Sequence, residues 1–70
     1  MPEHISNSVY TLRTQKELTQ EDLAEKVGVS RQTIIAIERG NYTPSVLLAL
    51  KIAAAFKTSV EQIFSITYEK

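Results

Sequence analysis

Two side chains that can bond the edges of nucleic-acid bases stand next to each other near the middle of the chain, Arg31 and Gln32. A guanidinium can bond O6 and N7 of guanine in a bidentate manner, and a glutamine amide can bond N6 and N7 of adenine. Ser30 precedes them and is a favoured N-cap residue, so we expect both side chains in the first turn of a helix. The alternative is that both are simply solvated residues of a first turn.

Residues suited to catalysis or metal binding are scarce by comparison. The chain has no cysteine, which excludes thiolate nucleophiles, disulfides and cysteine zinc sites. His4 is the only histidine, and the sequence offers no evident residues to complete a catalytic or metal site with it; there is neither a phosphate-binding loop nor a spaced His, Asp and Ser set. We therefore expect no enzyme activity, no metal and no cofactor, and interpret His4 as a solvent-exposed residue of the N-terminal tail.

Size and charge limit the class of protein. Seventy residues suffice for one small domain, residues 1–70, and no linker or repeat interrupts it. Eight Lys and Arg residues balance eight Asp and Glu residues, whereas nucleic-acid-binding proteins usually carry a basic surplus. No apolar run approaches the roughly 20 residues of a membrane span, and the first residues lack the pattern of a signal peptide. With the absence of cysteine, this predicts a cytoplasmic location.

Cap residues and glycines divide the chain into five expected helices. Gly28 and Gly40 each follow a periodic segment, as helix-ending glycines do. The expected helices span about residues 5–17, 20–27, 31–39, 46–56 and 60–64, with N-caps or capping boxes at Thr19–Asp22, Ser30, Ser45 and Ser59–Gln62. Residues 65–70 form a tail whose alternation suits a short β-strand. The predicted fold is all-α, with a compact five-helix core over residues 5–64.

The third expected helix contains three isoleucines and a glutamate that compete for its inner face. Because side chains step around a helix by about 100° each, Ile34 and Ile37 share the inner face and Ile35 falls on its border. Glu38 lies beside the inner face, where an unpaired carboxylate is costly. Arg13 follows a core position of the first helix, so we predict an Arg13–Glu38 ion pair. The alternative is a hydrated Glu38 at the edge of the helix.

The short turn at Gly28, between the second and third expected helices, is the arrangement of a helix-turn-helix, whose second helix enters the DNA major groove. The segment "LTQEDLAEKVGVSRQTIIAIERGNYTPS" (residues 18–45) resembles the Cro and phage-repressor type of helix-turn-helix, also called the XRE family. The resemblance extends over about residues 9–64, through Arg13 before this segment and Pro44-Ser45, Leu50, Ile52-Ala53 and "SVEQIF" (residues 59–64) after it.

The resemblance implies a dimeric, sequence-specific transcriptional regulator, expected to be a repressor, that reads a palindromic operator and is associated with the nucleoid. It implies base contacts from Arg31, Gln32 and Ala36, with Ile35 close by, and it favours the Arg13–Glu38 pair. The implied phosphate contacts come from Thr19, Gln20, Ser30, Thr33, Arg39, Asn41, Tyr42 and Thr43. Polar residues often stand at the Ile35 and Ala36 positions, so contact with a thymine methyl group is the physical substitute here. Tyr42 could equally brace its loop by packing.

The fourth expected helix is apolar nearly all round, although a helix facing one core needs only a stripe. With Val46, Ala49, Leu50, Ala53 and Phe56 facing inward, Leu47 and Leu48 lack an obvious core, as do Ile66 and Tyr68 in the tail. We expect these four to form a homodimer interface, as in short stand-alone members of the family that extend the interface with a terminal strand. The alternative is that the domain buries them itself. A second functional hypothesis is an antitoxin-like or other protein-binding module that binds DNA only secondarily.

Overall fold

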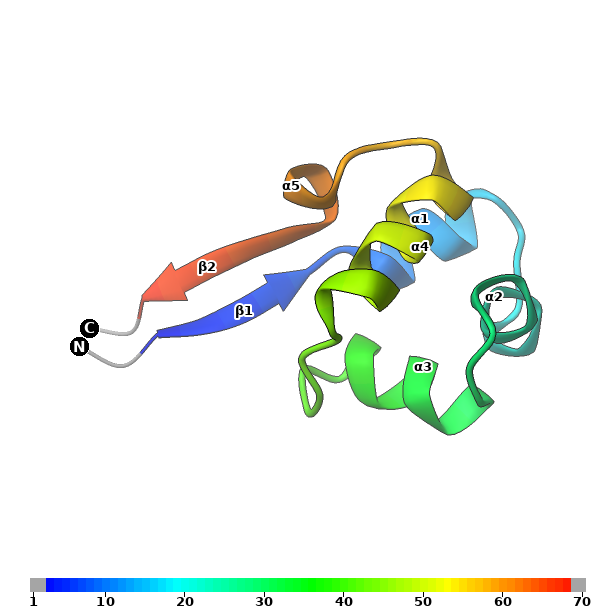
Figure 1. The fold of residues 1–70 in the computed structure, drawn as a ribbon, viewed down its shortest axis with the longest axis horizontal. Helices are drawn as coiled ribbons and strands as arrows, with labels where there is room; N and C mark the ends of the chain where they lie inside the picture. Colours follow the sequence, from blue (N-terminus) through cyan, green and yellow to red (C-terminus); the bar gives the residue numbers. More distant parts are fainter. Residues whose placement is uncertain (1–2, 69–70) are drawn as a thin grey trace.

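The chain folds into a helical body from which a two-stranded β-ribbon extends (Figure 1). The computed structural model describes residues 3–68. Within this range the elements follow in the order β1 (Glu3–Asn7), α1 (Val9–Gln15), α2 (Gln20–Val27), α3 (Arg31–Glu38), α4 (Val46–Phe56), α5 (Val60–Ile63) and β2 (Phe64–Tyr68). The predicted five-helix fold is confirmed, and the ribbon adds one strand that was not predicted.

The first helix is shorter than predicted at both of its ends. Ile5 lies in β1 rather than in a helix, and α1 begins only at Val9. The side chain of Asn7 accepts a hydrogen bond from the Val9 backbone N–H at 3.1 Å, which marks the change from strand to helix. At the other end Glu17 adopts a positive φ of 57°, which cannot continue a right-handed helix.

The tail forms a strand, as its alternation indicated, and its partner is the N-terminal segment of the same chain. β1 and β2 pair antiparallel, with Ile5 opposite Ile66 and Ser6 opposite Ser65. Successive side chains of a strand alternate between faces, so the isoleucines share one face and the serines the other. The two serine hydroxyls are 2.9 Å apart, and Thr67 donates to Ser6 at 2.9 Å. Residues 69 and 70 of the expected tail lie outside the described residues.

Side-chain caps begin three of the helices. Thr19 and Asp22 form the expected capping box, in which each accepts the backbone N–H of the other, at 2.9 and 3.0 Å. Ser30 and Ser45 accept the backbone N–H groups of Thr33 and Leu48. The box predicted at Ser59–Gln62 is absent, because the Gln62 N–H bonds to the backbone oxygen of Ser59 at 3.1 Å instead of to its hydroxyl.

One apolar core joins the helices, and all of its large residues come from their inner faces. Among residues 3–68, the largest side chains with no exposed surface are Val9, Leu23, Ile34, Ile37 and Ile52. Among residues 3–68, no helix is both long and apolar enough to cross a membrane.

The inward face of α4 differs from the prediction. Ala49, Ala53 and Phe56 are buried as expected, but Val46 is 77% exposed and Leu50 is 54% exposed. Leu48 and Ile52 complete the buried stripe in their place. Leu48, only 7% exposed, therefore belongs to the core of its own chain and is not available as an interface residue. Because α4 is apolar nearly all round, periodicity alone could not decide which stripe faces inward.

Candidate nucleic-acid interface

The turn between α2 and α3 positions the face that carries the candidate base readers. Gly28 ends α2 with a left-handed φ of 76°, and the Val29 N–H bonds to the Ala24 oxygen at 3.0 Å. Glycine adopts this conformation without the steric strain that a Cβ would add. Ser30 then opens α3 immediately. The result is two short helices joined by a tight turn, with α3 at the lower edge of the molecule in Figure 1.

The two faces of α3 separate as the sequence predicts. Ile34 and Ile37 are completely buried, so they fix the rotation of the helix about its axis. Arg31, Gln32 and Arg39 are exposed on the other side, whereas Ile35 and Ala36 are half-buried. Helical spacing places the predicted base-contacting residues and Arg39 on one continuous outer face.

The predicted phosphate-contacting residues lie around this outer face. Thr19 and Gln20 stand at the N-terminus of α2, and Asn41, Tyr42 and Thr43 are exposed in the loop that follows α3. The Asn41 N–H bonds to the Ala36 oxygen at 2.9 Å, which ties the start of this loop to α3. Ser30 and Thr33 are already engaged with each other, since their hydroxyl oxygens are 3.1 Å apart.

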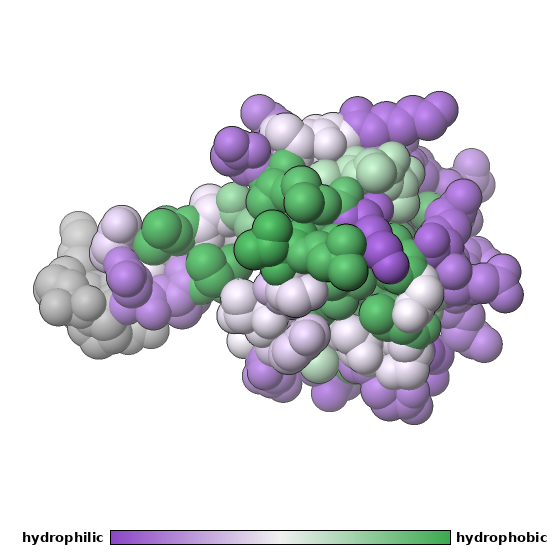
Figure 2. All heavy atoms as spheres, viewed as in Figure 1, coloured by the Kyte–Doolittle hydropathy of each residue, from purple (hydrophilic) through white to green (hydrophobic). Residues whose placement is uncertain are grey.

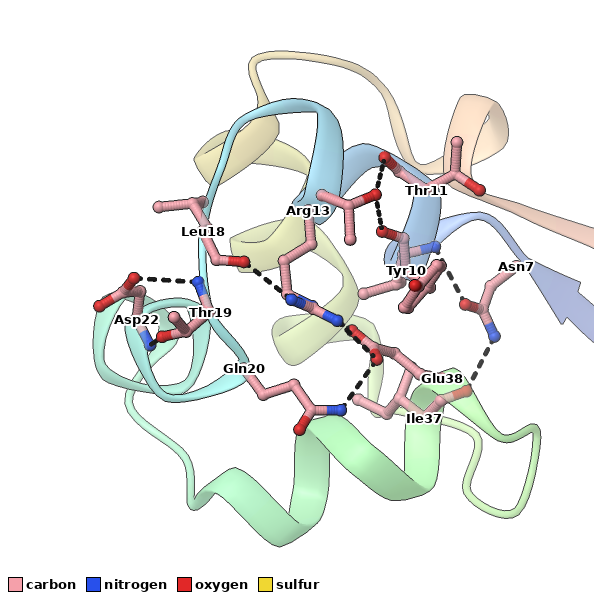
Figure 3. A network of polar contacts seen from close by, with 12 residues as sticks. Asn7, Tyr10, Thr11, Arg13, Leu18, Thr19, Gln20, Asp22, Ile37 and Glu38 are labelled. Atoms are coloured by element: carbon pink, nitrogen blue, oxygen red, sulfur yellow. Dashed lines mark hydrogen bonds and ion pairs between the residues drawn. The ribbon is translucent and has the colours of Figure 1, made fainter.

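The expected ion pair between Arg13 and Glu38 is present, and a third residue joins it (Figure 3). Arg13 Nε and Nη2 donate to the two carboxylate oxygens of Glu38, at 2.6 and 3.3 Å. Gln20 Nε2 donates to Glu38 Oε1 at 3.1 Å. The Arg13 and Glu38 side chains are only 10% and 6% exposed, which rules out the hydrated alternative for Glu38.

The network links three helices at the buried side of the candidate interface. Arg13 belongs to α1 and Gln20 to α2, while Glu38 is the last residue of α3. Arg13 Nη1 also donates to the backbone oxygen of Leu18 at 2.8 Å. Every nitrogen of the guanidinium is therefore bonded, which offsets much of the cost of burying the charge. Arg13 is a structural residue despite its charge.

Two residues of this region were not identified as important from the sequence. Asn7 donates from Nδ2 to the Ile37 oxygen at 2.9 Å, so it joins the root of the ribbon to α3. An asparagine two residues before a helix start is a recognisable capping signal, but its long-range bond is not. Tyr10 is exposed on α1, and the centroid of its ring lies 5.3 Å from the guanidinium carbon of Arg13.

The chemistry of this surface is that of hydrogen bonding and charge. Among residues 3–68, no group of three or more His, Cys, Asp or Glu side chains could hold a metal ion. The pKa of Asp22 is lowered, first by the Thr19 backbone N–H and then by the Thr19 side chain. That carboxylate serves the cap of α2.

A second, apolar surface lies on another part of the molecule, over α4 and the ribbon. Figure 2 shows apolar atoms gathered at the centre of this face and again on the ribbon. Leu47 is 64% exposed and Ile66 is 56% exposed, and Tyr68 is 60% exposed. An open groove of roughly 770 Å³ runs between α4, α5 and β1, with Ile5, Leu50 and Phe64 among its lining residues.

Known proteins resemble this chain over most of its length. A family model described as helix-turn-helix matches residues 9–63. An uncharacterised HTH-type transcriptional regulator of Methanocaldococcus jannaschii is 57% identical over 60 residues, which cover 86% of this chain and 91% of the relative. The restriction-modification controller protein C.AhdI from Aeromonas hydrophila superposes with a TM-score of 0.73, at 35% identity, covering 77% of this chain and 82% of that chain. The biofilm master regulator SinR, solved in complex with DNA, gives a TM-score of 0.70 at 31% identity, covering 76% and 86%.

Proposed function

Because the chain belongs to the helix-turn-helix family of the Cro and phage-repressor type, we propose that this transcriptional regulator is a dimeric repressor that reads a palindromic operator. The observation that supports the proposal is the division of α3 into a buried inner face and a solvent-exposed outer face. Buried Ile34 and Ile37 orient the helix, and Arg31 and Gln32 project from its first turn into solvent. The repressor would act at the nucleoid, by occupying promoter DNA.

Base recognition is assigned to the outer face of α3, lying in the major groove. Arg31 bonds the O6 and N7 atoms of guanine, and Gln32 bonds N6 and N7 of adenine. Ile35 and Ala36, half-buried one turn further along, contact the methyl groups of thymine. This division predicts a half-site that includes guanine, adenine and thymine.

Phosphate contacts surround the base readers and hold α3 in register. Gln20 binds from the N-terminus of α2, and Arg39 binds from the end of α3, followed by Asn41, Tyr42 and Thr43 of the loop. Thr19, Ser30 and Thr33 contribute through hydroxyl groups. The Thr19 oxygen accepts a cap bond, but its hydroxyl can still donate its own hydrogen to a phosphate oxygen. In the Ser30–Thr33 bond one hydroxyl donates to the other, so one hydrogen of that pair remains for a phosphate.

The homodimer is assigned to the apolar surface over α4 and the ribbon. Leu47, Ile66 and Tyr68 remain from the predicted interface, and exposed Val46 and Leu50 replace buried Leu48. Contiguous exposed apolar surface marks an interaction site, and an isolated two-stranded ribbon is only marginally stable in water. Dimerisation also suits the zero net charge, since two half-sites together supply the phosphate contacts that a neutral monomer supplies sparsely.

DNA reading is tested by electrophoretic mobility shift on the region upstream of the gene. Arg31→Ala and Gln32→Ala should each weaken specific binding by about 1–3 kcal/mol, and Gln32→Ala, which removes no charge, should have little effect on an unrelated duplex. Gln62→Ala is the matched control, because Gln62 is exposed on α5, far from α3 in Figure 1. Binding that is unchanged when Arg31 and Gln32 are both replaced would refute the assignment.

The dimer is tested by sedimentation equilibrium at micromolar concentration. The wild type should have the mass of a dimer, and Leu47→Glu with Leu50→Glu should give a monomer, because the new carboxylates would be desolvated in the interface. Gln15→Glu, at an exposed position of α1, should remain dimeric. A monomeric wild type would contradict the homodimer and favour the second hypothesis, a module that binds a different protein through the apolar groove.

A further inference from the structure

We propose that Tyr10 is a further DNA-contacting residue, whose hydroxyl donates to the same backbone phosphate as the Gln20 amide. Both donors border one hollow in the candidate interface, and the Arg13–Glu38 ion pair holds them in position. The inference rests on the proposed reading of DNA by α3, and it adds a contact from α1.

The hollow lies against the outer face of α3. It measures roughly 330 Å³, and its lining residues are Tyr10, Gln20, Arg31, Ile35, Glu38 and Arg39. Arg31, Ile35 and Arg39 belong to the face that is assigned to DNA, so a duplex docked on that face would cover the opening. Tyr10 is 60% exposed and can present its hydroxyl to a group that enters from solvent.

One ion pair orients both proposed donors. The Tyr10 ring lies 5.3 Å from the Arg13 guanidinium carbon, and Gln20 donates to Glu38 Oε1 at 3.1 Å. Figure 3 shows Tyr10 and Gln20 on opposite sides of the pair. A side-chain amide nitrogen carries two hydrogens, so Gln20 keeps one N–H for a ligand after bonding Glu38. Arg13 and Glu38 are therefore positioning residues for the two groups that touch the phosphate.

The charges around the hollow suit an anion. Glu38 alone would repel a phosphate, but Arg13 bonds both of its oxygens and neutralises it. Arg31 and Arg39 then leave the hollow with a net positive charge. Neutral donors such as a phenol and an amide add directional bonds to the phosphate oxygens, and bonds to a charged acceptor are stronger than those to a neutral one.

The test combines hydroxyl deletion with neutralisation of single phosphates. The probe is the duplex that the wild-type protein selects from a random pool, made with a methylphosphonate at one backbone position at a time. Tyr10→Phe removes the hydroxyl and keeps the ring over Arg13. Thr11→Val, on the neighbouring exposed residue of α1, is the matched hydroxyl deletion.

Tyr10→Phe should weaken binding about tenfold, on operator and unrelated duplexes alike, because a phosphate contact carries no sequence information. Thr11→Val should bind like the wild type. One methylphosphonate position should weaken wild-type binding strongly, and the same position should matter much less to Tyr10→Phe and to Gln20→Ala.

Wild-type affinity in Tyr10→Phe, or full sensitivity of that variant to every methylphosphonate, would overturn the inference. If Arg31→Ala and Gln32→Ala still lose specificity in that case, the proposed function stands without the Tyr10 contact. If the wild type selects no sequence from the pool, the proposed function itself fails.

Discussion

At the residue scale, the adjacent isoleucines of α3 occupy opposite environments. Ile34 has no exposed surface and packs in the core, whereas Ile35 is half-buried at the edge of the outer face and borders the polar hollow. Helical spacing predicts this separation from the sequence, because neighbouring residues point about 100° apart. Ile35 is therefore a proposed base reader although its type is typical of a core.

Shortening each isoleucine by one methyl group should have unequal effects. Ile34→Val should lower the free energy of unfolding by about 1 kcal/mol through lost packing in a filled core. Ile35→Val should change it by less than about 0.5 kcal/mol, as substitutions outside the core usually do. Urea denaturation of both variants measures the difference. Equal losses would show that Ile35 is also a core residue.

The Arg13–Glu38 pair gives a second prediction at this scale. Glu38→Gln should lower the free energy of unfolding by about 3 kcal/mol, because it leaves the guanidinium buried without a counter-charge. Thermal denaturation followed by circular dichroism measures the loss. Glu25→Gln is the control at an exposed position of α2 and should change stability by less than about 0.5 kcal/mol. An unchanged melting temperature in Glu38→Gln would mean that the pair contributes no net stability.

At the scale of elements, the capping box of α2 makes stability depend on pH. The pKa of Asp22 lies below its ordinary value of 3.8, chiefly because its carboxylate accepts the Thr19 backbone N–H. A group whose pKa is lowered by folding stabilises the folded state above its unfolded pKa, and the effect is lost as the pH falls through the folded pKa. The stabilisation by Asp22 should therefore be complete near neutral pH, begin to fall near pH 3.8 and disappear only below the lowered pKa of the folded state.

Asp22→Asn isolates this effect, because asparagine keeps an accepting oxygen but does not titrate. Urea denaturation of the wild type and the variant between neutral pH and pH 2 compares the two. The wild type should be the more stable at neutral pH, and the difference should close in the acid range. A difference that stays constant across the range would show that the carboxylate charge has no part in the cap.

The elements differ in how far the sequence predicts them. α2, α3 and α4 start at their predicted caps, because Thr19, Ser30 and Ser45 act on N–H groups only three residues away. Ile5 fits a helical period with Val9, so the spacing predicts a helix from about Ile5, within the segment that forms β1 in the structure. Its strand conformation depends on pairing with residues about sixty positions away in the chain, which local spacing does not report.

The same limit applies to the two candidate surfaces. The outer face of α3 could be predicted, because the apolar residues of that helix form a single stripe. The exposed residues of α4 could not be predicted, since a helix with apolar residues on every side can turn several stripes inward. For this reason the periodicity predicts Leu50 in the core and Leu48 in the interface, whereas the structure buries Leu48 and exposes Leu50. The place of Tyr10 in the candidate interface could not be predicted either, because it depends on the packing of its ring beside Arg13 in the folded protein.

At the scale of the whole molecule, the two surfaces have different chemistry and separate locations. The outer face of α3 and its surroundings supply hydrogen-bond donors and arginines, and the surface over α4 and the ribbon is apolar (Figure 2). Asn7 connects them, since it lies at the end of β1 and bonds to the Ile37 oxygen in α3. A dimer formed through the apolar surface would therefore present two copies of α3 in a defined relation to each other.

The central claim is that the outer face of α3 reads base sequence, and selection of bound duplexes from a random DNA pool tests it most directly. The wild type should enrich an inverted repeat with half-site centres about 10–10.5 base pairs apart, or a multiple of that spacing. Gln32→Ala should relax the preference at one base pair in each half-site and leave the spacing unchanged. No enriched sequence for the wild type, or the same sequence enriched by a variant lacking both Arg31 and Gln32, would contradict the claim.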